Sequence, residues 1–272
     1  MAVLGHLLSR SPDAVKPRAC NSADMSSASA PLGVVETVIH RLVSCRAMVT
    51  SIEPVAEVYR LVRLAGEDLR GRRWIPGEMI QLGFAGLNGR AYTPHAFDAE
   101  RGELEFLAFL HGPGLAADWL RSAGVGESLF FVGPRRALAF DAVPRPLFVF
   151  GDETSFSTAA VLHATREGMR GVTCVFEVED EASARVVLER LGLREGVTVI
   201  VRDAGGSHRE LLAGELERAV RSAPGLHCVF TGKAASIQWM YKTARRVGLT
   251  SKRVTNLAYW SPGRKGFSGV QR

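Results

Sequence analysis

The stretch PLFVFGDET, residues 146–154, decides how the second half of this chain folds. It begins as a continuous apolar run and ends in a glycine followed by polar residues. Strands that are apolar on both faces are typical of parallel sheets that have helices on both sides. The stretch therefore predicts a buried strand capped by a polar turn.

Apolar strands and amphipathic helices alternate after this stretch. We predict strands at 172–178, 197–201, 227–230 and 253–258, and helices at 155–169, 181–191, 207–221 and 234–247. This alternation indicates an α/β domain with a parallel sheet over residues 146–272. Ligands of such sheets bind beyond the carboxyl ends of the strands, which singles out the loops at 151–155 and 231–235.

The residues before 146 have a different pattern, with short β-rich segments between glycine and aspartate turns. We predict strands at 55–64, 74–82, 90–93, 104–111 and 125–136, whereas 34–40 is either a helix or a strand. Short strands at this spacing predict an antiparallel β-barrel over residues 34–145, closed by the strand at 125–136. Residues 1–33 are rich in Ser, Ala and Pro and are predicted to be a disordered tail.

Composition and charge exclude several classes of protein. The net charge of +6 and pI of 9.4 favour anionic ligands, but no dense Lys/Arg stripe predicts nucleic-acid binding. No apolar run approaches the roughly 20 residues that span a bilayer, so we expect no membrane span.

The four cysteines lack C-x-x-C spacing, which argues against a zinc knuckle or an iron–sulfur cluster held within the chain. Cys174 and Cys228 lie in apolar runs and are expected to be buried free thiols, which fits a reducing, cytoplasmic location.

The motif Arg90-Ala91-Tyr92-Thr93 ends a β-patterned segment. Side chains alternate along a strand, so Arg90 and Tyr92 point the same way, and Thr93 turns from the other face or leads into the bend. A cation, an aromatic ring and a hydroxyl suit a ligand with a phosphate and a flat ring, such as a flavin nucleotide. The alternative is that Arg90 and Tyr92 are solvent-facing strand residues.

Two loops offer backbone N–H groups to an anion. The stretch HGPGLAADWL, residues 111–120, places glycines before a predicted helix, and a helix N-terminus attracts anions. The alternative is a plain turn broken by Pro113 and Gly114. The second loop, 151–155, adds the hydroxyls of Thr154 and Ser155, but Asp152 and Thr154 are also good N-capping residues. Neither a G-x-G-x-x-G fingerprint nor a P-loop is present.

Taken in order, these segments resemble the siderophore-interacting protein family of ferredoxin–NADP reductase-like flavoproteins. The resemblance covers residues 49–267, and its most specific parts are the Asp-Glu-Thr turn at 152–154 and Tyr-Trp-x-x-Gly at 259–263. The other matching segments are Arg90-x-Tyr92-Thr93, Leu110-His111-Gly112 with Gly114 and Trp119, Gly133-Pro134-Arg135, Ser155, and Phe176-Glu177-Val178.

The resemblance implies a fold and a reaction. It implies an N-terminal flavin-binding antiparallel β-barrel and a C-terminal NAD(P)H-binding α/β domain with a parallel sheet. Members of the family reduce ferric siderophores and release Fe(II). Their electrons come from NAD(P)H, or from ferredoxin in some members, and pass through FAD. The expected cofactors are therefore FAD and NAD(P)H.

The resemblance also implies roles for individual residues. Arg90 would bind the FAD phosphates, while Tyr92 packs on the isoalloxazine ring and Thr93 hydrogen-bonds near flavin N5, so that Tyr92 and Thr93 act at the reacting centre. The residues implied at the pyrophosphate and adenosine side are His111, Gly112, Gly114, Ala116 and Ala117. Those implied near the nicotinamide are Asp152, Glu153, Thr154 and Ser155.

The chain departs from the family pattern at four places. Pro94-His95 replaces a frequent arginine, and Ala117-Asp118 removes a hydroxyl donor from the phosphate loop. Phe156-Ser157-Thr158 replaces an apolar-Pro-Ala run, and Gly232-Lys233 replaces Gly-Glu. A lysine in place of a carboxylate favours a phosphorylated nicotinamide cofactor or an acidic substrate, unless Lys233 is a solvated residue at the start of a helix.

Ferric siderophores are commonly anionic, so basic residues near the second loop and the C-terminus are candidate substrate contacts. These candidates are Lys233, Arg264 and Lys265. Lys242, Arg245 and Arg246 either join them or form a solvated helix end. Two other functions stay open. One is a related FAD and NAD(P)H reductase that acts on free flavin, haem or a quinone. The other is a non-catalytic siderophore- or flavin-binding protein.

Overall fold

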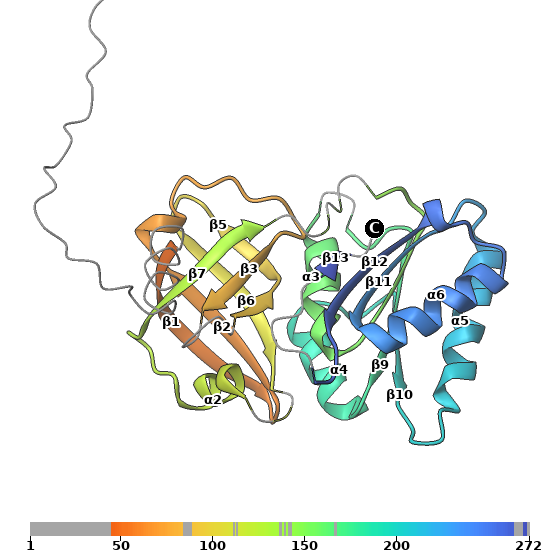
Figure 1. Cartoon of the computed structure of the whole chain (residues 1–272). Coiled ribbons are helices and arrows are strands. Elements are labelled where there is room, and N and C mark those ends of the chain that lie inside the picture. Colours follow the sequence, from red (N-terminus) through yellow and green to blue (C-terminus); the bar gives the residue numbers. More distant parts are fainter. Residues whose placement is uncertain are drawn as a thin grey trace, which may run out of the picture.

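The computed structural model describes residues 45–83, 89–110, 112, 114–135, 138, 140, 143–165, 168–263 and 269–270. The expected tail at 1–33 and the segment at 34–40 lie outside these residues. Two sheets stand side by side, an antiparallel one in the N-terminal half and a mainly parallel one in the C-terminal half (Figure 1). The two-domain architecture is thus confirmed, and the exact boundary between residues 145 and 146 stays a prediction.

The first sheet has seven strands in the order β4-β3-β7-β1-β2-β6-β5, and all neighbours are antiparallel. The strands are β1 (Cys45–Ala56), β2 (Tyr59–Ala65), β3 (Met79–Gly83), β4 (Gly89–Tyr92), β5 (Pro94–Asp98), β6 (Glu103–Phe109) and β7 (Ser128–Arg135). The edge strands β4 and β5 are separated in the chain by Thr93 alone. The sheet therefore curls until its two edges meet at this residue, as in a barrel.

Several strand predictions were wrong in detail. The predicted strand at 55–64 contains the end of β1 and most of β2, because a tight turn at Glu57 and Val58 interrupts a continuous β-rich run. The strand predicted at 74–82 begins only at Met79, after the break at Pro76-Gly77. The strand predicted to close the barrel is β7, and it lies inside the sheet between β3 and β1. The short strand β5 was not predicted.

Short helical segments accompany the first sheet. Helix α2 (Leu115–Ser122) lies at one end of the sheet (Figure 1), and the 3-10 turn η1 (Glu67–Leu69) follows β2. Helix α2 buries Ala116, Ala117 and Leu120 on one face, as its amphipathic pattern indicates. The prediction of a helix after the glycine-rich stretch is confirmed.

The second sheet has the order β10-β9-β8-β11-β12-β13. Its strands are β8 (Leu147–Gly151), β9 (Val172–Val178), β10 (Val197–Val201), β11 (His227–Lys233), β12 (Val254–Trp260) and β13 (Gly269–Val270). The first five are parallel, and β13 is antiparallel at the edge. All five residues of β8 are buried, as expected for a central strand covered on both faces.

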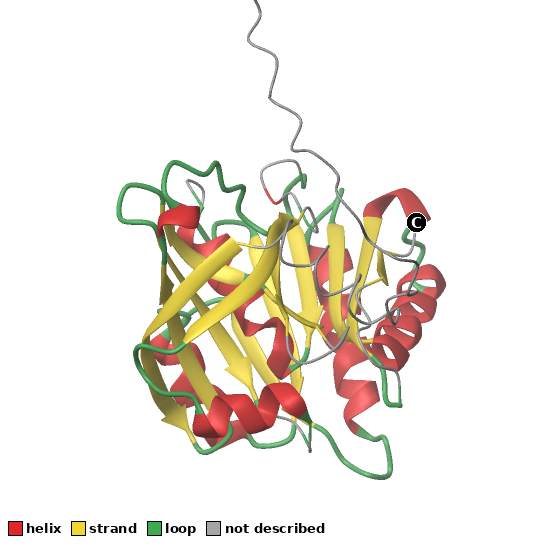
Figure 2. Ribbon diagram, turned by 60° about the vertical axis from the view of Figure 1, so that its left-hand side comes forward, coloured by secondary structure: helices red, strands yellow, loops and turns green. Residues whose placement is uncertain are grey.

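Helices cover both faces of this sheet (Figure 2). They are α3 (Phe156–Ala164), α4 (Glu181–Arg190), α5 (His208–Ser222) and α6 (Ala234–Arg246), with 3-10 turns η3 (Glu153–Ser155) and η4 (Ser251–Arg253). Alternate residues of β8 face opposite layers: Phe148 and Phe150 pack in the core of α5 and α6, and Val149 packs in that of α3 and α4. The prediction of a parallel sheet between helices is confirmed.

Helix α3 lies between the two sheets and is buried on every side over its first seven residues. Residues 156–162 are all buried, and the helix contacts β5 and β6 of the first sheet as well as its own domain. A helix that is apolar all round is stable only where both faces are covered. The sequence of α3 therefore requires the two domains to pack against each other.

A chain of aromatic rings crosses the domain interface. Tyr59 of β2 lies 5.1 Å from Phe109 and stacks on Phe156 of α3, with ring centroids 5.9 Å apart and planes at 13°. Phe156 in turn meets the edge of Phe176 at 5.0 Å. These rings belong to one hydrophobic cluster that contains residues of both domains, so the two domains share a core.

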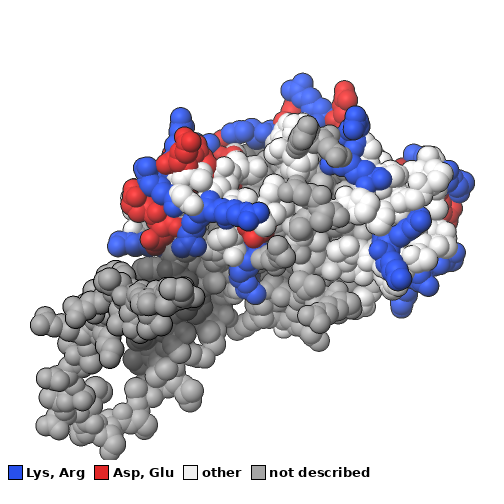
Figure 3. Space-filling view, turned by 90° about the horizontal axis from the view of Figure 1, so that it is seen from above, with Lys and Arg blue, Asp and Glu red and all other residues white. Residues whose placement is uncertain are grey.

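The remaining sequence expectations concern thiols, charge and membranes. Cys174 and Cys228 are buried and free, as predicted. On the face seen in Figure 3, Lys and Arg side chains of the described residues are spread over both halves, with Asp and Glu among them. None of the helices in the described part of the chain has the length and apolar character needed to cross a bilayer.

Candidate functional site

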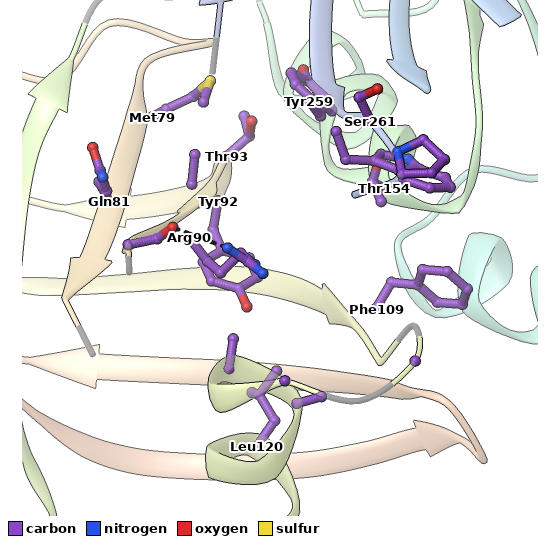
Figure 4. A pocket seen from close by; sticks show the side chains of 18 of the residues that line it. Met79, Gln81, Arg90, Tyr92, Thr93, Phe109, Leu120, Thr154, Tyr259 and Ser261 are labelled. Carbon is purple, nitrogen blue, oxygen red and sulfur yellow. Dashed lines mark hydrogen bonds between the residues drawn. The ribbon is translucent and has the colours of Figure 1, made fainter. Parts of the chain in front are cut away.

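A pocket of about 530 Å³ lies where the two sheets meet (Figure 4). Its size is typical of sites for small molecules and cofactors. The first domain contributes Met79, Gln81, Gly89, Arg90, Ala91, Tyr92, Thr93, Phe109, Gly112, Gly114, Ala116, Ala117 and Leu120. The second contributes Thr154, Tyr259, Trp260, Ser261, Pro262 and Gly263. The pocket thus joins the Arg-x-Tyr-Thr motif to the carboxyl ends of the second sheet.

Arg90 supplies a positive charge to this pocket. The side chain is half-buried, and Nη1 donates to the carbonyl oxygen of Gly89 at 3.4 Å. None of the ion pairs between described residues includes Arg90, so no carboxylate in this part of the chain neutralises its charge. In Figure 4 the side chain lies beside that of Tyr92 at the pocket. An uncompensated guanidinium there can bind a phosphate in bidentate fashion.

Tyr92 and Thr93 occupy the seam of the curled sheet. The ring of Tyr92 packs on Phe106 at 4.6 Å, with the planes tilted by 33°. Burial raises the pKa of the Tyr92 phenol, against the effect of Arg90, so the ring stays neutral. Thr93 follows directly and is only 7% exposed. Arg90 and Tyr92 both line the pocket, as the strand alternation predicts, and Thr93 lines it from the bend.

The start of α2 gives the pocket backbone donors. Gly112 and Gly114 have φ angles of 64° and 152°, which favour glycine, and a Cβ at either would meet no atom within 4 Å. No side chain caps the helix at Gly114. The amide groups of its first turn are therefore available to an anion, and Ala116 and Ala117 lie at the pocket wall.

The Asp152 carboxylate is hydrogen-bonded to donors of the protein itself, and Asp152 is not among the residues that line the pocket. Its carboxylate accepts hydrogen bonds from the amide groups of Thr154 at 2.9 Å and Lys233 at 2.8 Å, and from Trp260 Nε1 at 2.7 Å. Ser155 completes a capping box with Asp152. Burial raises the pKa of Asp152, while the hydrogen bonds from Thr154 and Trp260 oppose that shift. Asp152 therefore acts as an N-capping residue, which was the alternative to a ligand contact in the sequence analysis.

Glu153 points into the second domain. It is 2% exposed and forms a two-pronged ion pair with Arg202, with oxygen–nitrogen distances of 2.6 and 3.0 Å. It also accepts the amide of Glu179 at 2.6 Å. Of the four residues predicted near a nicotinamide, Thr154 alone is among the pocket-lining residues, while Asp152, Glu153 and Ser155 shape the turn that carries it.

The candidate substrate contacts divide into two groups. The amide of Lys233 binds Asp152, and its Nζ lies 5.4 Å from the centre of the Trp260 ring, a cation–π contact. Lys233 is not among the residues that line the pocket. Arg264, Lys265 and the predicted cofactor residue His111 lie outside the residues that the structure describes. The described residues contain no group of three His, Cys, Asp or Glu placed to hold a metal ion.

Sequence reasoning missed most of the wall supplied by β12. Tyr259 Oη lies 2.7 Å from Thr158 Oγ1, and Trp260 is fixed by Asp152. Residues 259–263 line the pocket, although only their motif was used as a sign of resemblance. Gln81 was also missed; it reaches across Gly89, where a Cβ would lie 2.3 Å from its amide nitrogen, and it accepts a hydrogen bond from Arg135.

The comparisons with known proteins agree with this geometry. Residues 71–138 match the siderophore-interacting FAD-binding domain, which includes the Arg90 motif and helix α2. No curated protein has significant sequence similarity to the chain. This match supports the resemblance that the sequence motifs indicated, and the matched residues lie in the first domain.

Solved structures with the same fold include siderophore proteins and reductases. A siderophore utilization protein from T. fusca aligns with a TM-score of 0.62 and 21% identity, over 82% of this chain and 95% of that one. A siderophore-interacting protein from Acinetobacter baumannii gives 0.65 and 17%, over 82% and 92%. A ferredoxin NADP+ reductase from Neisseria gonorrhoeae, with bound FAD and NADP, gives 0.65 and 12%, over 80% and 99%. Residues 71–138 are thus similar in sequence to the siderophore-interacting FAD-binding domain, and the chain has the same two-domain fold as these siderophore proteins and this ferredoxin NADP+ reductase.

Proposed function

We propose that the protein is an FAD-dependent reductase of ferric siderophores that passes electrons from NAD(P)H, or from ferredoxin, to Fe(III) and releases Fe(II). The observation that carries the proposal is the donor set of the pocket. The Arg90 guanidinium, which has no carboxylate partner among the described residues, the amide groups of α2 and the Thr93 hydroxyl all lie within the segment that matches the siderophore-interacting FAD-binding domain.

The residues present fit FAD. Arg90 and the N-terminus of α2 offer a charge and backbone donors to two phosphates, and the glycines at 112 and 114 leave open space beside them. Tyr92 offers a neutral aromatic ring to the isoalloxazine, and Thr93 offers a hydroxyl to the polar edge of that ring. The departures at Pro94-His95 and Ala117-Asp118 leave this donor set in place.

The second domain supplies the place for an electron donor. Thr154, in the turn η3 after β8, and the β12 residues Tyr259 and Trp260 close the pocket opposite the Arg90 motif. The contacts of Asp152 and Glu153 hold the turn that carries Thr154. A bound FAD supplies the capacity to accept a hydride and to release single electrons, so the protein only has to bind, orient and exclude water. NAD(P)H would approach along the carboxyl ends of the parallel strands.

The ferric siderophore would bind at the mouth of the pocket. Lys233 lies against Trp260, a residue that lines the pocket, and Arg264 and Lys265 follow the β12 motif in the chain, so these three cations are the proposed contacts of the siderophore. An anionic iron chelate suits such a mouth. Free flavin, haem and quinones are the competing acceptors.

The test starts from the FAD-loaded protein under anaerobic conditions. NADH, NADPH and reduced ferredoxin are titrated in separate samples while the flavin absorbance is recorded, and a ferric siderophore is then added together with an Fe(II)-specific chelator. We expect bleaching by at least one nucleotide or by reduced ferredoxin, followed by recovery of absorbance and formation of the Fe(II) complex. Recovery with free flavin, haem or a quinone but not with ferric siderophores would overturn the substrate assignment.

A further inference from the structure

A second group of charged residues lies beyond the carboxyl ends of β9 and β10. These strands are on one side of β8, and β11 and β12 are on the other (Figure 1). Numbered from β8, the order of the parallel strands is 3-2-1-4-5, the arrangement of dinucleotide-binding sheets. In such sheets a carboxylate beyond the second strand accepts a hydrogen bond from the ribose 2′-hydroxyl of NAD, or an arginine nearby accommodates the 2′-phosphate of NADP. The charges that follow β9 and β10 therefore discriminate between the two nucleotides.

Arg202, directly after β10, is engaged by carboxylates of the protein. Its Nη1 donates to Glu153 Oε2 at 3.0 Å and to the carbonyl oxygen of Glu177 at 2.8 Å. Its Nη2 donates to Glu153 Oε1 at 2.6 Å and lies 3.3 Å from a carboxylate oxygen of Glu179. Two carboxylates thus face one guanidinium, and both of its terminal nitrogens are already engaged. Arg202 therefore offers a nucleotide phosphate neither free donors nor an uncompensated charge.

The N-terminus of α5 is engaged in the same way. The Asp203 carboxylate accepts hydrogen bonds from the amide of Ser207 at 3.1 Å, the hydroxyl of Ser207 at 2.9 Å and the amide of His208 at 2.7 Å. Donors at the start of a helix are the ones that commonly bind a phosphate. The hydrogen bonds from His208 and Ser207 hold the pKa of Asp203 below its ordinary value, so the carboxylate stays ionised. An anion of the protein thus already occupies this helix start.

Two further carboxylates follow β9. Asp180 accepts the amides of Ala182 and Ser183 at the start of α4, at 3.1 and 3.0 Å. The side chain of Glu179 is 77% exposed, so its carboxylate faces solvent as well as Arg202. Arg209 adds a positive charge on the exposed first turn of α5, but Glu179, Asp180 and Asp203 outnumber it.

Lys233 does not compensate these charges, because it lies at the end of β11, on the other side of β8, against Trp260. The edge beyond β9 and β10 is therefore acidic.

We propose that the nucleotide donor of this protein is NADH, and that Glu179 and Asp203 are specificity-determining residues that reject NADPH. This inference rests on the proposed function. Glu179 can accept a hydrogen bond from a ribose hydroxyl, as an exposed carboxylate does in NAD-binding sheets. A 2′-phosphate carries up to two negative charges at neutral pH, so it would meet like charges and find the donors of Arg202 and α5 occupied.

The experiment measures the binding of two probes that contain no nicotinamide and require no flavin chemistry. Isothermal titration calorimetry of the full chain compares ADP-ribose with 2′-phospho-ADP-ribose, which differ only in the phosphate. We expect ADP-ribose to bind at least about tenfold more tightly at low salt, because two like charges face the added phosphate at short range. The difference should shrink as salt is added, since exposed charges are screened. A ratio that does not respond to salt would contradict rejection by charge.

The double variant Glu179→Gln, Asp203→Asn removes both charges and keeps the shape of the side chains. Asn caps a helix about as well as Asp, so the start of α5 should persist. The preference for ADP-ribose should fall at least about threefold, mainly through tighter binding of the phosphorylated probe. The matched control is Glu67→Gln, Asp98→Asn in the first domain. It changes the net charge equally, and Asp98 also accepts two backbone amides of a turn. The control should keep the unsubstituted preference.

The outcomes separate this inference from the proposed function. A chain that binds neither probe contradicts the use of a nicotinamide donor, which belongs to the proposed function, and this inference fails with it. Equal binding of the two probes, or tighter binding of the phosphorylated one, overturns the assignment of NADH alone. An unchanged preference in the Glu179→Gln, Asp203→Asn chain overturns the roles of these two residues.

Discussion

Trp260 Nε1 donates a hydrogen bond of 2.7 Å to Asp152 Oδ2, and this bond ties the end of β12 to the end of β8. The same carboxylate accepts the amide of Lys233, at the end of β11. Gly232 packs against it so closely that a Cβ would lie 2.6 Å from the carboxylate, and its φ of 97° also favours glycine. One buried aspartate therefore fixes the second-domain wall of the pocket.

Asp152→Asn should destabilise the protein by about 1–3 kcal/mol. The substitution replaces one carboxylate oxygen, a hydrogen-bond acceptor, with an NH2 group, so the N–H group that donated to this oxygen loses its partner. Urea unfolding followed by tryptophan fluorescence measures the change. The matched control is Asp180→Asn, at the exposed N-cap of α4, where Asn and Asp are nearly equivalent. Equal stabilities of the Asp152→Asn and unsubstituted chains would show that the Asp152 contacts do not hold the wall.

Arg202→Leu should cost about 3–5 kcal/mol, because it leaves the buried charge of Glu153 without its partner. Adding Glu153→Gln removes that charge and should recover part of the loss. Arg185→Leu is the control, since its pair with Glu181 is exposed and worth at most about 1 kcal/mol. A loss no larger than that of the control would mean that the Glu153–Arg202 pair does not stabilise the fold.

Phe156→Ala should cost about 3–5 kcal/mol, because Phe156 is fully buried between Tyr59 and Phe176. Since the two domains share this core, calorimetry should show one unfolding transition that moves as a whole to lower temperature. Phe130→Ala, at a 41% exposed ring, should change stability by about 0.5 kcal/mol or less. Two separate transitions in the unsubstituted chain would contradict a shared core.

Glu105 makes stability depend on acid pH. Hydrogen bonds from His95 and Arg63 hold the pKa of Glu105 below its ordinary value of 4.5, against the effect of burial. A lowered folded-state pKa means that the stabilisation is present above the ordinary value and is lost as the pH falls through the folded value. The free energy of unfolding should therefore fall below pH 4.5, and less steeply in Glu105→Gln. Identical acid profiles for the two chains would refute this assignment.

The second domain was predictable because its first four strands are short apolar runs, each followed by a helix of ordinary length. The boundaries of 172–178 and 197–201 were confirmed residue for residue. The hairpin at Glu57 and Val58 was missed, since no glycine, proline or asparagine marks it. Its place is set instead by the pairing of β1 with β2.

The site was only partly predictable, because its walls are distant in the sequence. Arg90 and Tyr92 could be grouped by strand alternation, and Thr93 by its place directly after them at the bend. Tyr259 and Trp260 reach the pocket through the order of strands in the second sheet, which periodicity does not reveal. The polar turn at 152–154 could also be recognised in the sequence. Only the fold shows that the Asp152 carboxylate accepts hydrogen bonds from the amides of Thr154 and Lys233 and from the Trp260 ring.

Titration of the purified chain with FAD tests the central claim most directly, because every proposed role depends on FAD in the pocket beside Arg90. We expect flavin fluorescence to be quenched to saturation at one FAD per chain. Arg90→Ala should weaken binding by about 1.5–3 kcal/mol, roughly 10- to 150-fold, while unfolding as the unsubstituted chain does. Arg101→Ala, in an exposed pair with Asp98, should bind normally. Absence of quenching, or an Arg90→Ala chain with unchanged affinity, would contradict the account.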